Sequence, residues 1–541
     1  MFLLNLAPAI SYLIDMNRRT HGVYGLNEVL LATALPLLVF SIFSAQPLTI
    51  VGFTGLASLF NFTNFDILER CGLSIDQYQQ FQAWMLLWAA IMHILIAVFN
   101  GCDYTRFITE MTSTTFGLYV GVIYIQKGVE VLVEEFHVST DSAWVSVLTA
   151  ILFAVVVYLL ERAAQASVVP FSLRRILEDW TFFAGLLFFS GFVHISGHIK
   201  EAHAELLPVT AAFKPTLERD WVVPFWKLEV AWVFAAIPFG FLLTLLFYFD
   251  HNVSSLMAQA RHFPVQRPAG FHWDFFLLGI TTLISGILGL PAPNGLVPQA
   301  PVHTESLSVK KLVTFESEVD GKSGTNSTRT VVVRTRVVEQ RVSHLAMGLL
   351  TLGTMTGPLL KVLSLMPRAV FAGIFLLVGW ASIEDNPIIH NTIFLVRERR
   401  TIPHDHPLRD VRKVQIAKFV SIQWLVFGSS LALSQTLAAI GFPLVFMALI
   451  PVRHFILPKF FARAELDALD APTANAPNTL VSIGGPLPES EDEATATMPG
   501  TGTVTPKAHA HDVETVQIAP GEQVVPVVHD KDIVGGVGAA R

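Results

Sequence analysis

The chain has 541 residues, of which 52% are hydrophobic and only 15% charged, and it contains 41 phenylalanines. This composition, with a mean hydropathy of +0.53, excludes an ordinary soluble fold and indicates an all-α, multi-pass protein embedded in a lipid bilayer. The net charge of −7 divides into basic and acidic loops, so nucleic acid is not an expected partner. Two cysteines, Cys71 and Cys102, allow one disulfide at most and leave the redox compartment open.

Apolar runs occur along the chain from its first residues. A straight membrane-spanning helix needs about 20 apolar residues. We expect twelve full spans. The first is short, which we interpret as a chain start lacking residues that precede it; a deeply placed N-terminus is the alternative. The twelve runs are Phe2–Ile14, Val29–Ser44, Trp84–Phe99, Phe116–Leu132, Ala143–Leu160, Phe182–Ile195, Leu228–Phe249, Phe271–Leu288, Ala346–Leu365, Val370–Ile383, Phe419–Leu433 and Ala438–Pro451.

Two further segments, Gln46–Phe62 and Gly289–Leu307, are interrupted. Each begins extended and passes Gly or Pro before it becomes compatible with helix, and four prolines keep the second extended until about Val302. They are the third and tenth segments, so the chain divides into two halves of seven. Corresponding broken segments predict a transporter with 7+7 inverted repeats and a substrate site where the half-helices meet.

The helix N-termini expected near Thr54 and His303 would present unpaired backbone N–H groups that suit an anion or a polyhydroxy oxyacid. The side chains of Thr54, His303 and Thr304 are candidate substrate donors beside them. An isolated histidine is more often a packed structural residue. The backbone groups are therefore the stronger part of this hypothesis.

Asp250 ends the apolar run FGFLLTLLFYFD and is followed by more membrane-compatible chain. A carboxylate within a membrane segment is a functional candidate by default, and Ser254, four residues on, shares its helical face. The alternative is that Asp250 only marks the end of a span in headgroup water. Together the two residues offer an acceptor that could bind a proton and one hydroxyl.

Enzymatic and metal chemistry find little support. His194, His198 and Glu201 have helical spacing but lack an H-E-x-x-H pattern. The sequence has no P-loop, no G-x-S-x-G elbow and no cysteine pairs. We therefore expect no enzyme, no metal and no cofactor.

Loop charges predict orientation, because Lys and Arg favour the cytoplasmic side. Most basic loops fall on the side of the N-terminus, so both termini are expected in the cytoplasm, although Arg18 and Arg19 break the rule. The insertion Ser308–Arg341 could form a hairpin around Val331–Val338 or remain a loosely ordered loop. Ala464–Arg541 is rich in Ala, Pro, Thr and Gly, and we expect a disordered tail.

Several long motifs resemble one family, the bicarbonate transporters and anion exchangers, and within it the boron exporters of fungi and plants. The resemblance covers most of the chain from Leu4 to about Pro451. The motifs are QPLTIVGFTG at Gln46–Gly55, YIQKG at Tyr124–Gly128, LFYFDHNVSSLMAQ at Leu246–Gln259, and FHWDFFLLG followed by GLPAPNGLVPQAPVHTESL.

The resemblance implies a core domain (residues 1–102 and 226–365) that moves against a gate domain (103–225 and 366–463), with homodimers formed through the gate domain. It implies that Asp250 and Ser254 belong to the substrate site and that Ser11 contributes a hydroxyl. Gln299 falls where the animal chloride/bicarbonate exchangers carry an arginine, which fits a substrate that is largely neutral boric acid in equilibrium with borate.

From these observations we expect a plasma-membrane boron exporter, with proton coupling through Asp250 as a hypothesis. Two alternatives stay open. The first is a bicarbonate or other inorganic anion transporter of the same fold, and the second is a membrane scaffold that transports nothing.

Overall fold

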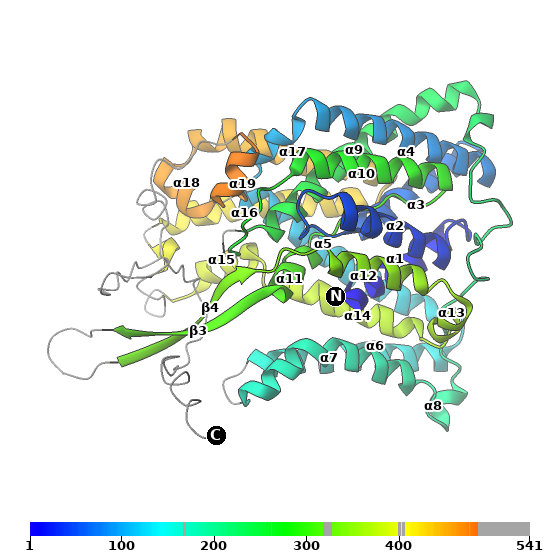
Figure 1. Ribbon diagram of the computed structural model, residues 1–541, viewed down its shortest axis with the longest axis horizontal. Helices are drawn as coiled ribbons and strands as arrows, with labels where there is room; N and C mark the ends of the chain where they lie inside the picture. The colour runs from blue at the N-terminus through cyan, green and yellow to red at the C-terminus, as the bar shows by residue number, and fades with distance from the viewer. Residues whose placement is uncertain are drawn as a thin grey trace, which may run out of the picture.

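The computed structural model describes residues 1–165, 169–260, 262–317, 327–398, 402, 406–409, 411–474 and 476–484. The described residues form an α-helical bundle (Figure 1). They also contain two two-stranded sheets. The strands are β1 (Val51–Gly52), β2 (Asn294–Gly295), β3 (Ser308–Ser317) and β4 (Ser327–Val337). The helices are α1 (Phe2–Arg19), α2 (Leu26–Phe43), α3 (Gly55–Arg70), α4 (Ile75–Val98), α5 (Glu110–Glu135), α6 (Thr140–Gln165), α7 (Phe171–Phe192), α8 (His198–Glu201), α9 (Val230–Ala258), α10 (Phe271–Leu288), α11 (Gln299–Ser306), α12 (Val342–Gly353), α13 (Gly357–Leu363), α14 (Arg368–Glu384), α15 (Pro387–Val396), α16 (Lys413–Ser434), α17 (Phe442–Pro451), α18 (Arg463–Leu469) and α19 (Pro477–Ser482).

Among the described residues, eight helices are long and apolar enough to cross a membrane, or up to ten if each bent pair counts as one span. The expected run Ala346–Leu365 is not straight, because α12 and α13 meet at 87° across the break that follows Gly353. A second bent pair, α14 and α15, meets at 53°. The chain is therefore multi-pass, with fewer straight spans than the twelve expected.

The two interrupted segments have the predicted form, since each is a short strand followed by a half-helix. Strand β1 pairs antiparallel with β2, joining Val51 to Gly295 and Gly52 to Asn294. Helix α3 follows β1, and α11 follows β2. The two half-helices are thus held together by their extended arms.

The expected start of the second half-helix was wrong, because α11 begins at Gln299 and not at His303. Pro301 lies in its first turn, where a backbone N–H would have no acceptor within the helix, so the missing donor costs nothing. Proline also sets a helical φ at that position. The run of prolines therefore delays the helix by less than the sequence indicated.

The packing of the long helices agrees with an inverted repeat. Helix α4, the fourth segment, packs along α10, the ninth, while α12, the eleventh, packs along α2, the second. When each segment number is changed by seven, the pair of the fourth and ninth segments becomes the pair of the eleventh and second. In a third pair, α5 and α14 cross closely, and a Cβ on Gly379 would stand 2.7 Å from the Gly121 carbonyl oxygen. Helices α6 and α7 lie side by side along one edge of the bundle (Figure 1).

The insertion forms a hairpin, with β3 and β4 paired antiparallel and projecting from the bundle (Figure 1). The hairpin alternative is thus confirmed over the loose loop, although residues 318–326 lie outside the described part of the chain. At its base, Glu305 of α11 pairs with Lys310 at 2.6 Å and with Arg334 at 2.8 Å. Glu305 is therefore a structural acid.

The expected disorder from residue 464 is wrong for the first part of the tail. Residues 463–474 and 476–484, which we call the C-terminal strap, contain α18 and α19 and fold back on the start of α5. The Asp470 carboxylate accepts the Met111 N–H at 2.7 Å, and the Glu110 N–H donates to the Ala471 carbonyl at 2.9 Å. Leu466 is buried against the bundle. The rest of the tail, residues 485–541, lies outside the described residues.

Candidate functional site

The candidate site lies where the β1–β2 pair rests on α9. A Cβ on Gly295 would stand 2.7 Å from the His251 Cα and 3.1 Å from the Ser254 Cβ, so β2 lies directly on the helix. Only glycine allows this approach. The extended arms consequently place their backbone beside Asp250 and Ser254.

Asp250 is 3% exposed, and its Oδ2 accepts a hydrogen bond from the Asn294 side-chain Nδ2 at 2.8 Å. The Asn294 Oδ1 in turn accepts the Gly295 N–H at 2.8 Å, which fixes the amide so that its hydrogens face the carboxylate. This bond orients Asp250 at the strand crossing. Asn294 was not predicted, because an Asn-Gly pair in sequence indicates a turn before it indicates a binding group.

Ser254 lies one turn beyond Asp250 and is fully buried, and its hydroxyl has no hydrogen-bond partner among the described residues. The same holds for the Gln299 Oε1 at the first residue of α11 and for the amide of Asn5. The Asn5 Oδ1 stands 3.4 Å from the position of a Cβ on Gly52. Buried polar atoms are normally satisfied, so this group around the crossing is equipped to bind a polar solute.

Thr54 has the predicted place at the N-terminus of α3, where its Oγ1 accepts the Ala57 N–H at 3.2 Å. Its hydroxyl therefore caps the half-helix. Helix α11 has Pro298 at its N-cap and no side-chain cap. In the first turn of α11, Pro301 has no N–H and the Ala300 N–H donates to the Leu296 carbonyl oxygen at 3.0 Å. The Gln299 N–H is therefore the candidate backbone donor to an oxyanion.

His303 and Thr304 are fully buried and hold the arms together. The His303 Nδ1 lies 3.2 Å from the Leu48 carbonyl oxygen, and its Nε2 lies 2.8 Å from the Ser343 Oγ. Thr304 donates to the Ala258 carbonyl at 2.8 Å. Both side chains are engaged in bonds between segments, so their predicted contact with substrate has no support in this geometry.

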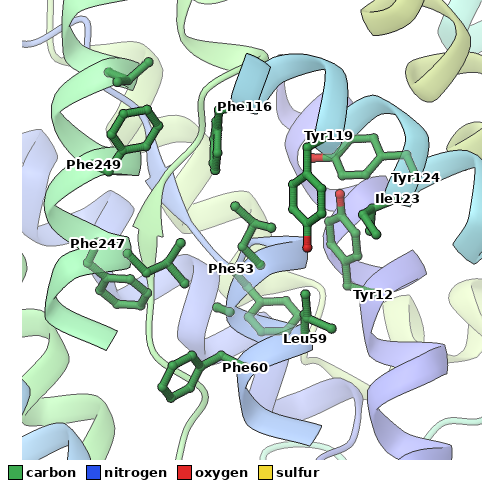
Figure 2. Close-up of a cluster of buried hydrophobic side chains, with 14 of the residues drawn as sticks. Tyr12, Phe53, Leu59, Phe60, Phe116, Tyr119, Ile123, Tyr124, Phe247 and Phe249 are labelled. Carbon is green, nitrogen blue, oxygen red and sulfur yellow. The ribbon is translucent and has the colours of Figure 1, made fainter. Parts of the chain in front are cut away.

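Ser11 is also engaged elsewhere, since its hydroxyl lies 2.9 Å from the Ala7 carbonyl oxygen and 3.3 Å from that of Phe371. Its neighbour Tyr12 is better placed and was not predicted. A Cβ on Gly55, at the start of α3, would stand 2.3 Å from the Tyr12 Cε1. Figure 2 shows Tyr12 beside Phe53 and Tyr124, with ring centroids 6.4 and 5.5 Å away.

The residues considered for a metal do not converge. The His194 Nε2 lies 2.8 Å from the Leu365 carbonyl oxygen, and His198 pairs with Glu201 on the surface at 3.4 Å. Across the part of the chain that the structure describes, no group of three or more His, Cys, Asp or Glu side chains could hold a metal ion.

The fit between β2 and α9 predicts a large effect for Gly295→Ala. The added methyl must displace the His251 backbone, so the variant is expected to lose about 1–3 kcal/mol of stability. The measurement is the melting temperature of the detergent-solubilised protein. Gly428→Ala is the matched control, because its Cβ would meet nothing within 4 Å. Equal melting temperatures for the two variants would contradict the close fit.

Comparison with known proteins agrees with this architecture. A family model described as the HCO3- transporter integral membrane domain matches residues 1–142 and 136–474. The chain is 44% identical over 468 residues to a candidate transporter of Schizosaccharomyces pombe, covering 86% of this chain and 88% of that protein. It is 37% identical over 480 residues to boron transporter 1 of Saccharomyces cerevisiae, covering 87% and 79%.

Among solved structures, the transmembrane domain of the cyanobacterial bicarbonate transporter BicA superposes with a TM-score of 0.53 at 13% identity. The match covers 81% of this chain and 94% of that one, and it shows a shared fold. The chain has two interrupted segments that form half-helices, and the family model spans nearly the whole described chain. Both observations assign the chain to the same family. The chain belongs to the bicarbonate transporter family, whose members are membrane transporters.

Proposed function

We propose that the chain exports boron, as boric acid or borate, across the plasma membrane by alternating access. The observation that carries the proposal is the buried Asp250 carboxylate, hydrogen-bonded to Asn294 at the crossing of the two half-helix arms. The yeast relative at 37% identity is named a boron transporter, which supports the choice of substrate within the family.

The chemistry of the site fits boric acid. This solute carries three hydroxyl groups that can donate, and the Asp250 carboxylate is an acceptor buried beside the strands. The uncapped start of α11 and the Thr54 end of α3 present helix N-termini that favour negative charge on oxygen. Gln299 is a neutral residue at this point, so the site has hydrogen-bonding capacity without a fixed positive charge from that position.

The half-helix arms are bound to α9 as one unit. Thr49 of the first arm lies 3.2 Å from the Ser255 hydroxyl, and Thr304 of the second bonds the Ala258 carbonyl. We therefore propose that the two half-helices and α9 move together in the core domain, by an elevator-type or rocking motion against the gate domain. The gate domain is the proposed site of homodimer contact.

The proposed orientation has both termini in the cytoplasm, as the loop charges favour. Proton coupling through Asp250 is part of the proposal, because a carboxylate at membrane depth can exchange a proton during the transport cycle. A bicarbonate or other inorganic anion transporter of the same fold is the competing function.

Boron efflux measured in cells that express the chain tests the proposal directly. We expect loaded cells to lose boron faster than cells without the chain. Reconstituted vesicles provide the second arm. Chloride-dependent bicarbonate flux without boron flux would favour the competing anion transporter, and the absence of any solute flux from correctly folded protein would favour a scaffold.

A further inference from the structure

Six charged side chains gather where α1 and α5 approach one another, at the end of α1 remote from the N-terminus. The Lys127 Nζ lies 2.9 Å from the Asp15 Oδ2 and 2.7 Å from the Glu130 Oε2. Arg18 pairs with both Asp15 and Glu134. Arg19 stands 3.5 Å from Asp15 and 3.9 Å from Glu130.

The centre of this group is buried, since the side chains of Asp15 and Lys127 are 4% and 8% exposed. Helix α3 also takes part, because the Arg19 guanidinium lies 4.3 Å and the Lys127 ammonium 4.9 Å from the centre of the Phe62 ring. Under the proposed division, α1 and α3 belong to the core domain and α5 to the gate domain. The contacts therefore cross the boundary between the two moving parts.

The group also lies directly beyond the candidate site. Tyr12 covers the start of α3 and contacts Tyr124, and three residues further along each helix come Asp15 and Lys127. Helical geometry places residues three apart on the same face. Asp15 and Lys127 therefore lie about one turn beyond Tyr12 and Tyr124, toward this end of the bundle. Beside the pair is a cavity of about 460 Å³, lined by Arg18, Arg19, Gln126, Val129, Glu130, Val133 and Glu134.

We propose that the buried Asp15–Lys127 pair, with the arginine and glutamate pairs around it, is the outer gate of the transport pathway. When the ion pairs are formed, they hold the core domain against the gate domain. The Asp15–Lys127 pair must separate before the site can open outward. A buried ion pair suits this role, because its two charges attract strongly when dry and are well solvated when water enters. Arg18 and Arg19 do not follow the rule that basic residues lie on the cytoplasmic side. In this proposal they have a function, because they pair with the acidic residues of the outer gate.

The proposal rests on the proposed alternating-access transport but not on its substrate, so the test measures gate opening without boron. Cys71 and Cys102, the two native cysteines, are changed to serine, and Ser58→Cys provides one reporter thiol. Ser58 is buried on α3 between Thr54 and Phe62, on the same helical face. The reporter is labelled in intact cells by a charged, membrane-impermeant thiol reagent.

Lys127→Met is expected to raise the labelling rate about tenfold, since it removes the central attraction between the two domains. Glu130→Gln removes a partly exposed acceptor without leaving Asp15 alone, and a smaller rise is expected. Arg412→Gln is the control, because it breaks the exposed Arg412–Glu465 pair of the strap and should leave labelling unchanged.

A merely structural pair makes a different prediction. The double variant Asp15→Asn, Lys127→Met leaves no unpaired charge at the centre, so its melting temperature should recover toward that of the parent protein. Labelling should stay fast if the pair is a gate and should fall to the parent rate if it is only structural. Unchanged labelling in folded Lys127→Met and Glu130→Gln proteins would overturn the proposal.

Discussion

Replacing Asp250 with asparagine is expected to lower boron efflux at least about 100-fold while the protein stays folded. Asparagine keeps the shape of the side chain, and its amide oxygen can still accept the Asn294 hydrogen bond at the strand crossing. The variant loses the negative charge and the ability to take up a proton. The measurement is boron efflux from loaded cells, normalised to the amount of protein in the membrane.

The pH dependence of the remaining efflux tests proton coupling in the same variant. If Asp250 carries the proton, efflux by the Asn variant should no longer change with the proton gradient. Asp103→Asn is the control carboxylate, because Asp103 is partly exposed and pairs with His272 at 3.0 Å. Its efflux should remain close to that of the parent. Normal efflux with normal pH dependence in Asp250→Asn would remove this residue from the mechanism.

Ending the chain after Ala462 is expected to lower the free energy of unfolding by at least about 3 kcal/mol. The truncation removes the buried leucines Leu466 and Leu469, and it removes the Asp470 carboxylate that accepts the Met111 N–H. The side chain of Thr109, the N-cap residue, does not cap α5. The Asp470 carboxylate, from a distant part of the chain, caps this helix instead. Thermal unfolding of the detergent-solubilised protein is the measurement.

A chain that ends after Gly484 is the matched control for this truncation and should unfold at the parent temperature. Asp470→Ala is expected to fall between the two, because it removes the cap and also leaves Arg453 without its carboxylate partner. Equal stability of the two truncated proteins would show that the strap adds nothing to the fold.

The sequence identified the features that depend on local chemistry. Prolines and glycines punctuate a backbone regardless of its neighbours, so the two broken segments could be located in advance. Asp250 stood out because a charge within an apolar run is costly and therefore rare. The sequence also located Thr54 at a helix N-terminus, but it predicted a substrate donor there, and the structure shows that its hydroxyl caps α3.

The remaining features depend on which faces meet in the folded protein. Asn294 and Tyr12 reach the site only because β2 lies on α9 and α1 crosses the start of α3. His303 and Thr304 stand beside the site in sequence, but the packing turns them toward other segments. The strap was missed because the average composition of a long tail concealed a short segment with buried leucines.

The β3–β4 hairpin projects from the helical bundle and is directly attached to the half-helix α11. Only Leu307 separates the end of α11 from the first residue of β3, and Glu305 clasps both strands through Lys310 and Arg334. A displacement of α11 in the proposed transport cycle would therefore move β3 and β4 with it. A protein or lipid that binds the β3–β4 hairpin would slow the proposed transport cycle without contacting the substrate.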